Sequence, residues 1–179
     1  MSIPLQARSG AWQPALELLE PISLVRCCTS PLGRNLCMIV TETAVHVYAT
    51  SDESPNLSFE PVTSFFLGCR ATGASWSPST QHASTAWRIE ILVATETNEL
   101  RLLESVRQGS EASTSNKKLA DTYARVTDLA WCASPGYESY AAAACSDGTV
   151  RLWDLEGGCR THYLLSLIHI SEPTRQEAI

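Results

Sequence analysis

Cysteines and histidines are the residues of this chain best able to bind a metal ion or to act as nucleophile and base. Seven cysteines occur among the 179 residues, at Cys27, Cys28, Cys37, Cys69, Cys132, Cys145 and Cys159. No pair has the CxxC spacing, and no cysteine is spaced with a histidine as in a zinc site. Several fall within apolar stretches, as buried thiols commonly do. We therefore expect free cysteines in a reducing compartment, no metal site and no bound cofactor.

A hydrolase-like set could be assembled from Ser146, Asp147 and His162, but the surrounding sequence opposes it. The GxSxG turn that exposes a nucleophilic serine is missing. Asp147 precedes a glycine, and in such a turn its carboxylate accepts hydrogen bonds from backbone amides. His46 lies within the run AVHVY, where packing or exposure on a strand is a more common role than metal binding. The sequence thus predicts no catalytic residue and a protein that is not an enzyme.

Composition restricts the possible partners. The formal net charge of −6 disfavours nonspecific binding to nucleic acid, which requires a cationic surface. Hydrophobic residues make up 44% of the chain, enough for a buried core, yet no apolar run reaches the roughly 20 residues of a membrane helix. The first residues lack the apolar segment of a secretory signal. We expect no nucleic-acid partner, no direct membrane insertion and a location in the cytosol or the nucleus.

The elements that would position these side chains are clearest between residues 126 and 165. A small, apolar strand at 140–145 is followed by the tight turn Asp147-Gly148 and by an alternating strand at 149–153. The glycine supplies the positive φ that such a turn needs. Further strands are expected before this hairpin at 126–131 and after it at 159–165. Four short strands separated by turns therefore make one structural unit.

Two earlier segments repeat this order of turns and strands. In the first, a Ser-Pro turn at 30–31 accompanies strands at 24–28, 36–40, 44–48 and 57–66. In the second, a Ser-Pro turn at 77–78 accompanies strands at 73–76, 88–95 and 100–103, with a polar insertion at 81–86 and a Ser/Thr-rich loop at 108–116. Recurrence of one four-stranded unit predicts a repeat protein whose units stack on one another.

The third unit ends its third strand in Trp153-Asp154, and its pattern resembles one blade of a WD-repeat β-propeller. The predicted fold class is all-β, an incomplete WD40-type propeller with about three four-stranded blades. We expect a variable N-terminal lead at 1–20 and blades at about 21–67, 68–123 and 124–165. Because a propeller needs at least four blades to close, three blades predict an incomplete ring.

The last residues, 166–179, break the repeat. The run LIHISEPTRQEAI has no Ser-Pro turn, no Asp-Gly turn and no tryptophan. It resembles a translated adapter sequence of cDNA libraries, which predicts a truncated reading frame followed by an artefactual tail. A divergent linker is the alternative.

Residues 68–165 are also similar to the small WD-repeat nucleoporins of the Y-shaped outer-ring complex of the nuclear pore. The similarity lies in the run GASWSP at 73–78, the long insertion, LRLL at 100–103 and RLWDLEGGCRTHYLL at 151–165. It implies a noncatalytic scaffold that supports nucleocytoplasmic transport at the nuclear envelope. It also implies a protein partner, a large propeller–solenoid nucleoporin of the outer ring. The alternative is an adaptor subunit of a ubiquitin ligase or chromatin complex.

Five residues are expected to hold the third blade together, namely Trp131, Asp147, Gly148, Trp153 and Asp154. Many WD repeats carry a histidine before the first strand that joins the turn aspartate and the tryptophan in a buried network. The stretch at 121–126 has no histidine, so this network should be partial. Trp87 follows the polar insertion at 81–86, and we expect it to be an exposed contact for a partner.

Overall fold

The computed structural model describes residues 18–51, 58–157 and 160–166. These residues form strands and no helix, so the predicted all-β class is confirmed. Within these ranges no helix is long and apolar enough to cross a membrane. Most of the expected lead, residues 1–17, and the tail from residue 167 onward lie outside the described part of the chain.

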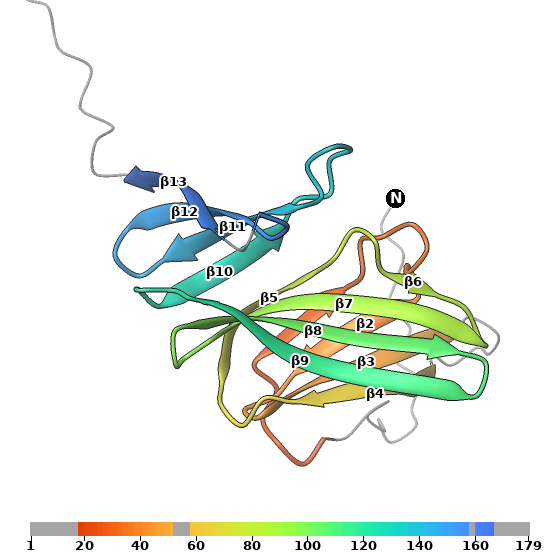
Figure 1. Ribbon diagram of the computed structural model, residues 1–179. Helices are drawn as coiled ribbons and strands as arrows, with labels where there is room; N and C mark the ends of the chain where they lie inside the picture. The colour runs from red at the N-terminus through yellow and green to blue at the C-terminus, as the bar shows by residue number, and fades with distance from the viewer. Residues whose placement is uncertain (1–17, 52–57, 158–159, 167–179) are drawn as a thin grey trace, which may run out of the picture.

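The described strands form three antiparallel sheets, each joined in chain order (Figure 1). The first contains β1 (Leu24–Cys27), β2 (Leu36–Val40), β3 (Ala44–Ser51) and β4 (Ser58–Phe66). The second contains β5 (Ala71–Trp76), β7 (Ala86–Thr95), β8 (Glu99–Gln108) and β9 (Glu111–Asp121), with β6 (Gln81–His82) paired to β7. The third contains β10 (Val126–Trp131), β11 (Tyr140–Cys145), β12 (Thr149–Asp154) and β13 (Arg160–Ser166).

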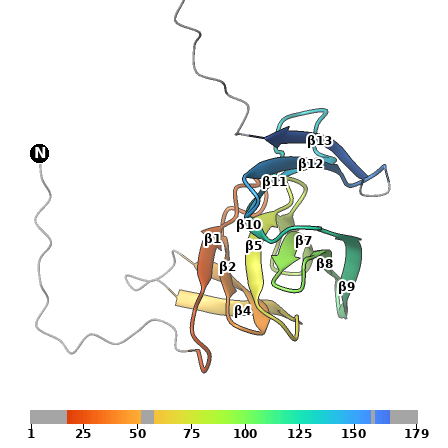
Figure 2. The same ribbon diagram turned by 90° about the vertical axis from the view of Figure 1, so that its left-hand side faces the viewer.

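The three sheets radiate from a common centre (Figure 2). In this view the first strands of the sheets, β1, β5 and β10, lie together, and the fourth strands, β4, β9 and β13, lie at the outside. Each sheet thus has the position of a propeller blade, and we refer to them as blades 1, 2 and 3. The radial order places the hairpin turns of every blade at the two ends of the stack.

Apolar side chains from both faces of blade 2 hold the stack together. Ile89, Ile91 and Val93 point toward blade 1 and pack in one core with its strands β2 and β3. Leu92 and Ala94 alternate with them and pack in a second core with blade 3. All five side chains are fully buried. The apolar run from Ile91 to Ala94 is typical of a strand covered on both faces.

Blades 2 and 3 approach each other closely at Gly73 of β5. A Cβ atom at this position would lie 3.2 Å from the Cβ of Leu129 and 3.3 Å from its backbone nitrogen. The absence of a side chain at Gly73 therefore lets the inner strands β5 and β10 come together.

Two arginines at equivalent positions of blades 2 and 3 tie each blade to the one before it. Arg101 in β8 donates from Nη1 to the carbonyl of Leu67 at 3.0 Å. Arg151 in β12 donates in the same way to the carbonyl of Thr122 at 3.3 Å. Leu67 and Thr122 each directly follow the fourth strand of the preceding blade. Each guanidinium therefore fixes the segment through which the chain passes from one blade to the next.

The Asp147-Gly148 turn holds the second of these arginines in place. Gly148 has a φ of 77°. The Asp147 carboxylate accepts hydrogen bonds from the hydroxyl and the amide of Thr149, at 2.6 and 3.1 Å, and from Nη2 of Arg151 at 2.9 Å. The hydrogen bonds from Thr149, together with the positive charge of Arg151, lower the pKa of Asp147. The carboxylate thus orients the side chain that connects blades 2 and 3.

Two segments of blade 2 were predicted to be loops, and both predictions are wrong because the segments contain strands. The Ser/Thr-rich stretch at 108–116 is a hairpin turn and the first half of β9, because Gly109 with a φ of 62° reverses the chain and β8 continues to Gln108. The side chains of residues 111–118 are all exposed, so an outer strand can be polar on both faces. The insertion at 81–86 contains β6 and the first residue of β7, and β6 pairs with Trp87 and Arg88 to form a second short hairpin.

Trp153 lies in the core between blades 2 and 3 with 2% of its surface exposed. Its indole Nε1 has no hydrogen-bond partner among the described residues. The turn carboxylate that would join it in a complete WD network is instead bound by Thr149 and Arg151. Trp153 therefore contributes to the interface through apolar packing.

Replacing Trp153 by alanine should lower the free energy of unfolding by about 3–5 kcal/mol, because a large cavity would remain in the core. Urea denaturation followed by circular dichroism measures this change. Phe66→Ala is the control, since Phe66 is 74% exposed and its loss should cost no more than about 0.5 kcal/mol. Equal effects of the two substitutions would contradict the buried position of Trp153.

Candidate functional site

A groove with a volume of about 640 Å³ opens between blades 1 and 2, at the end where β7 begins. Blade 1 contributes Thr50 and Glu60, and blade 2 contributes His82, Trp87 and Arg107. A second hollow of about 480 Å³ shares these three residues of blade 2. We call the two hollows together the Trp87 groove. Their common wall is the aromatic side chain of Trp87.

Trp87 is held in the groove from several sides. It is half-buried and packs against the core between blades 1 and 2. Its Nε1 donates to Oγ of Ser105 at 3.1 Å. The guanidinium carbon of Arg107 lies 4.9 Å from the indole centroid, a cation–π distance, and the His82 ring lies 6.0 Å away. The indole is therefore fixed in orientation and is only partly available to a partner.

The sequence predicted Trp87 as an exposed residue after a loop, and the structure places it differently. Trp87 is the second residue of β7 and pairs with Arg107 of β8 and His82 of β6. It shares the face of β7 that carries Ile89 and Ile91, which explains its partial burial. Trp87 is thus a half-buried strand residue and not an exposed loop residue, and its contact with a partner stays a prediction. The remaining exposed part of the indole lines the groove.

His82 joins the two blades across the groove. Its Nδ1 lies 3.0 Å from the amide nitrogen of Asn35, and its backbone amide donates to the carbonyl of Leu32 at 2.9 Å. Burial lowers the pKa of His82 below its ordinary value, so the ring is neutral at physiological pH. Because Asn35 and Leu32 belong to the first turn of blade 1, these bonds fix the width of the groove.

The walls of the groove carry charges of both signs. Arg107 donates from Nε to the carbonyl of Gly109 at 3.0 Å and keeps its charge above the indole. Glu60 is exposed on the opposite wall. An aromatic surface flanked by a cation and an anion suits an extended peptide segment, whose side chains and backbone can meet all three.

The buried carboxylate of Glu90 stabilises the part of blade 2 that lines the groove. Glu90 is 7% exposed and accepts hydrogen bonds from Ser77 at 2.9 Å, from Ser79 at 2.8 Å and from Arg88 at 2.8 Å. Burial by itself raises the pKa of Glu90, but the bonds from Ser79, Arg88 and Ser77 outweigh burial and lower it. The ionised carboxylate thus holds the Ser-Pro turn and places Arg88, which lines the groove beside Trp87.

The five residues predicted to hold the third blade do not line the groove. Trp131 is half-buried at the end of β10, and its Nε1 donates to the carbonyl of Glu138 at 2.6 Å. Asp147, Gly148 and Trp153 have the positions described above. Asp154 accepts hydrogen bonds from the amides of residues 156 and 157 and so caps the next turn.

Among the described residues, the cysteines and histidines lie outside the Trp87 groove, apart from His82. The six cysteines in the described part of the chain are free thiols. His46 occupies the position in blade 1 that Arg101 and Arg151 occupy in the other blades, and its Nδ1 lies 3.0 Å from Oγ of Ser64. His162 lies in β13, whose side chains are outside the described residues.

Sequence reasoning missed several residues that shape these sites. Arg101 and Arg151 lie in the matching runs LRL and VRL. Because a charged residue alternates there with apolar ones, these runs were the available signal. The sequence around Arg107 and His82 contains no such signal, because the roles of these two residues depend on the pairing of β6, β7 and β8.

No protein-family model matches the chain, and a search of curated proteins found no relative. Similar solved structures include the WD40 domain of SCAP from fission yeast, with a TM-score of 0.52 and 14% identity over 74% of this chain and 28% of that one. A chain of the mitotic checkpoint complex has a TM-score of 0.48 and 22% identity, over 74% and 36% of the two chains. Sqt1 from Chaetomium thermophilum, solved with the N-terminus of ribosomal protein L10, has a TM-score of 0.48 and 14% identity, over 96% and 56%.

The likeness to the SCAP domain, together with the radial order of the sheets, shows the fold. The described chain has the fold of an incomplete WD40-type β-propeller. It spans between about a quarter and just over half of the length of these structures.

Glu90→Gln should lower the free energy of unfolding at neutral pH by about 1–3 kcal/mol, because the charge-assisted bonds are lost. It should also flatten the loss of stability in acid. Since the pKa of Glu90 is lowered on folding, its contribution is fully present above the unfolded pKa of about 4.3 and disappears as the pH falls through the folded pKa.

Denaturation curves between pH 7 and pH 3 measure both effects. Glu60→Gln changes an exposed carboxylate on the opposite wall and is the control, with a change in the free energy of unfolding at neutral pH of no more than about 0.5 kcal/mol. An unchanged acid dependence in Glu90→Gln would contradict the assigned role of this carboxylate.

Proposed function

We propose that this chain is a noncatalytic protein-interaction scaffold that docks on a protein partner through the Trp87 groove. The observation that carries this proposal is the arrangement of Trp87, with its indole fixed between His82 and Arg107 at an opening between two blades. A rigid, half-exposed tryptophan loses little conformational entropy on binding.

The fold supports a binding role for strand ends and turns. Apolar side chains on both faces of blade 2 pack against the neighbouring blades and are therefore not accessible to a partner. The ends of the blades, where the polar groups of turns and the groove residues lie, stay open to a partner. A partner segment in the groove would meet an aromatic surface, the charge of Arg107 and the carboxylate of Glu60.

The finer assignment that we propose is a scaffold subunit of the nuclear pore outer ring. Its support is the resemblance of residues 68–165 to the small WD-repeat nucleoporins. The partner would then be the large propeller–solenoid nucleoporin of the ring. The protein would be located at the nuclear pore complex in the nuclear envelope and would support nucleocytoplasmic transport.

Trp87→Ala should weaken the complex by about 2 kcal/mol or more, because it removes the aromatic anchor. It should also lower the melting temperature, since Trp87 packs against the core between blades 1 and 2. Trp131→Ala is the matched control: it removes a half-buried tryptophan outside the groove and should leave binding unchanged.

In the experiment, the full chain and both variants are immobilised and incubated with a nuclear-envelope extract. The proteins that each chain retains are identified by mass spectrometry. Outer-ring nucleoporins should be retained by the original chain and by Trp131→Ala, and lost with Trp87→Ala. Subunits of a ubiquitin ligase or chromatin complex in their place would reject the nucleoporin assignment. Equal retention by all three chains would reject the Trp87 groove as the docking site.

A further inference from the structure

A polar pocket of about 250 Å³ lies where the inner strands of the three blades come together. Its lining includes Arg26 of β1, Arg70 before β5, Arg125 before β10 and Asp128 of β10. Three cationic side chains and one carboxylate therefore surround a small space. This local excess of positive charge occurs in a chain whose formal net charge is −6.

One of the three arginines is already neutralised. Nη2 of Arg26 lies 2.8 Å from Oδ1 of Asp128, and this ion pair joins blade 1 to blade 3 across the pocket. The guanidinium groups of Arg70 and Arg125 make no ion pair or hydrogen bond within the described residues. The carboxylate of Glu96 is nearby, but it accepts a hydrogen bond from the backbone amide of Arg70.

Arg70 and Arg125 occupy equivalent positions in neighbouring blades. The carbonyl of Arg70 accepts a hydrogen bond from the amide of Glu96 at 2.9 Å, and the carbonyl of Arg125 accepts one from the amide of Ser146 at 2.8 Å. Each residue thus directly precedes an inner strand and is fixed by the second hairpin turn of its own blade. Both side chains therefore enter the pocket from the same end of the stack.

We infer that this pocket binds one anionic side chain of a protein partner, with Arg70 and Arg125 as the donors. A guanidinium presents a planar fork that matches the oxygens of a phosphate or a carboxylate. A phosphorylated residue carries a charge of about −1.5 to −2 at neutral pH, which two unpaired arginines can balance. The formal net charge of −6 opposes binding of a long polyanion, so a single anionic group in a peptide is the ligand that fits.

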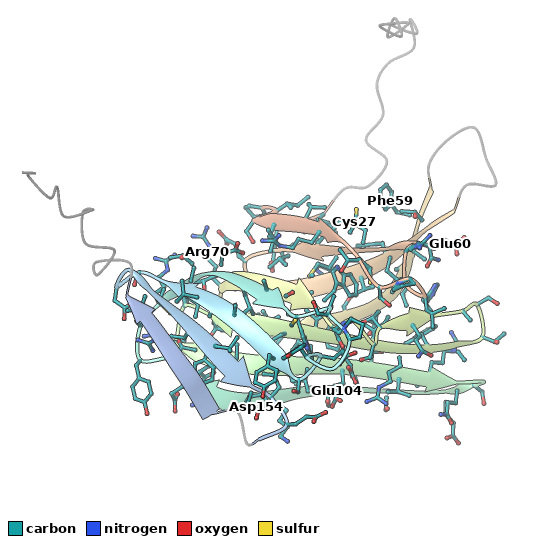
Figure 3. All side chains as sticks on the ribbon, turned by 90° about the horizontal axis from the view of Figure 1, so that it is seen from above. Cys27, Phe59, Glu60, Arg70, Glu104 and Asp154 are labelled. Carbon is teal, nitrogen blue, oxygen red and sulfur yellow. The ribbon has the colours of Figure 1, made fainter. Side chains whose placement is uncertain are left out.

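This site is separate from the Trp87 groove. Thr95 at the end of β7 pairs with Ala71, next to Arg70, whereas Trp87 lies near the start of the same strand. The two sites are therefore about 25 Å apart along β7, at about 3.3 Å per residue. Figure 3 shows Arg70 and the groove residue Glu60 well separated, on opposite sides of the molecule. The anion pocket stands whether or not the groove binds a partner.

The test uses a fluorescent peptide of glycine and serine with one phosphoserine, and fluorescence anisotropy with the full chain at low salt. Binding should fall by about tenfold or more in Arg70→Gln/Arg125→Gln. Arg34→Gln removes one positive charge from an exposed turn outside the pocket, and it should leave binding within about twofold. The unphosphorylated peptide should not bind, and added salt should weaken the complex.

Three further outcomes decide the proposal. Binding of a glutamate-containing peptide, lost in the same double variant, would support the pocket and identify a carboxylate as sufficient. Binding of inorganic phosphate without binding of the peptide would overturn the peptide ligand. Absence of phosphopeptide binding, or equal losses with Arg34→Gln and the double variant, would overturn the site, provided that unchanged circular dichroism spectra show the variants folded.

Discussion

Contact between neighbouring sheets is the constraint on which this structure depends. A four-stranded sheet of this size has apolar residues on both faces and cannot bury them alone. Blade 2 meets this requirement completely, because Ile91 packs toward blade 1 and Leu92 toward blade 3. The close approach at Gly73 and the hydrogen bonds of Arg101 and Arg151 to the preceding blade follow from the same packing. The position of each blade is therefore set by its neighbours.

This packing also decides where binding can occur. The strand faces between neighbouring blades are used for packing, and the two candidate binding sites lie at the two ends of the stack. At one end, the opening between blades 1 and 2 holds Trp87 with Arg107 and His82. At the other, the inner strands place Arg70 and Arg125 around a small polar pocket. A partner that reached both ends would combine an aromatic anchor with an anionic contact.

Local sequence patterns predicted most of the strands, since turn chemistry and alternation are encoded within a few residues. The strands at 36–40, 126–131 and 140–145 have the boundaries expected from their flanking turns. The polar outer strand β9 was missed because exposure on both faces removes the alternation that marks a strand. The site was harder to predict than the fold. Trp87 was identified as an aromatic after an insertion, but its contacts with His82 and Arg107 depend on pairing between three strands.

Amide hydrogen exchange tests the central claim, that burial on both faces makes blade 2 more stable than blade 3. The comparison is between the central strands β7 and β11, which are paired on both edges in their sheets. Side chains of β7 from Ile89 to Ala94 are buried on both faces, whereas those of β11 alternate between buried and half-buried. We predict that the β7 amides exchange more slowly, with a protection free energy equal to that of global unfolding. Equal protection of the two strands, or slower exchange in β11, would contradict the account.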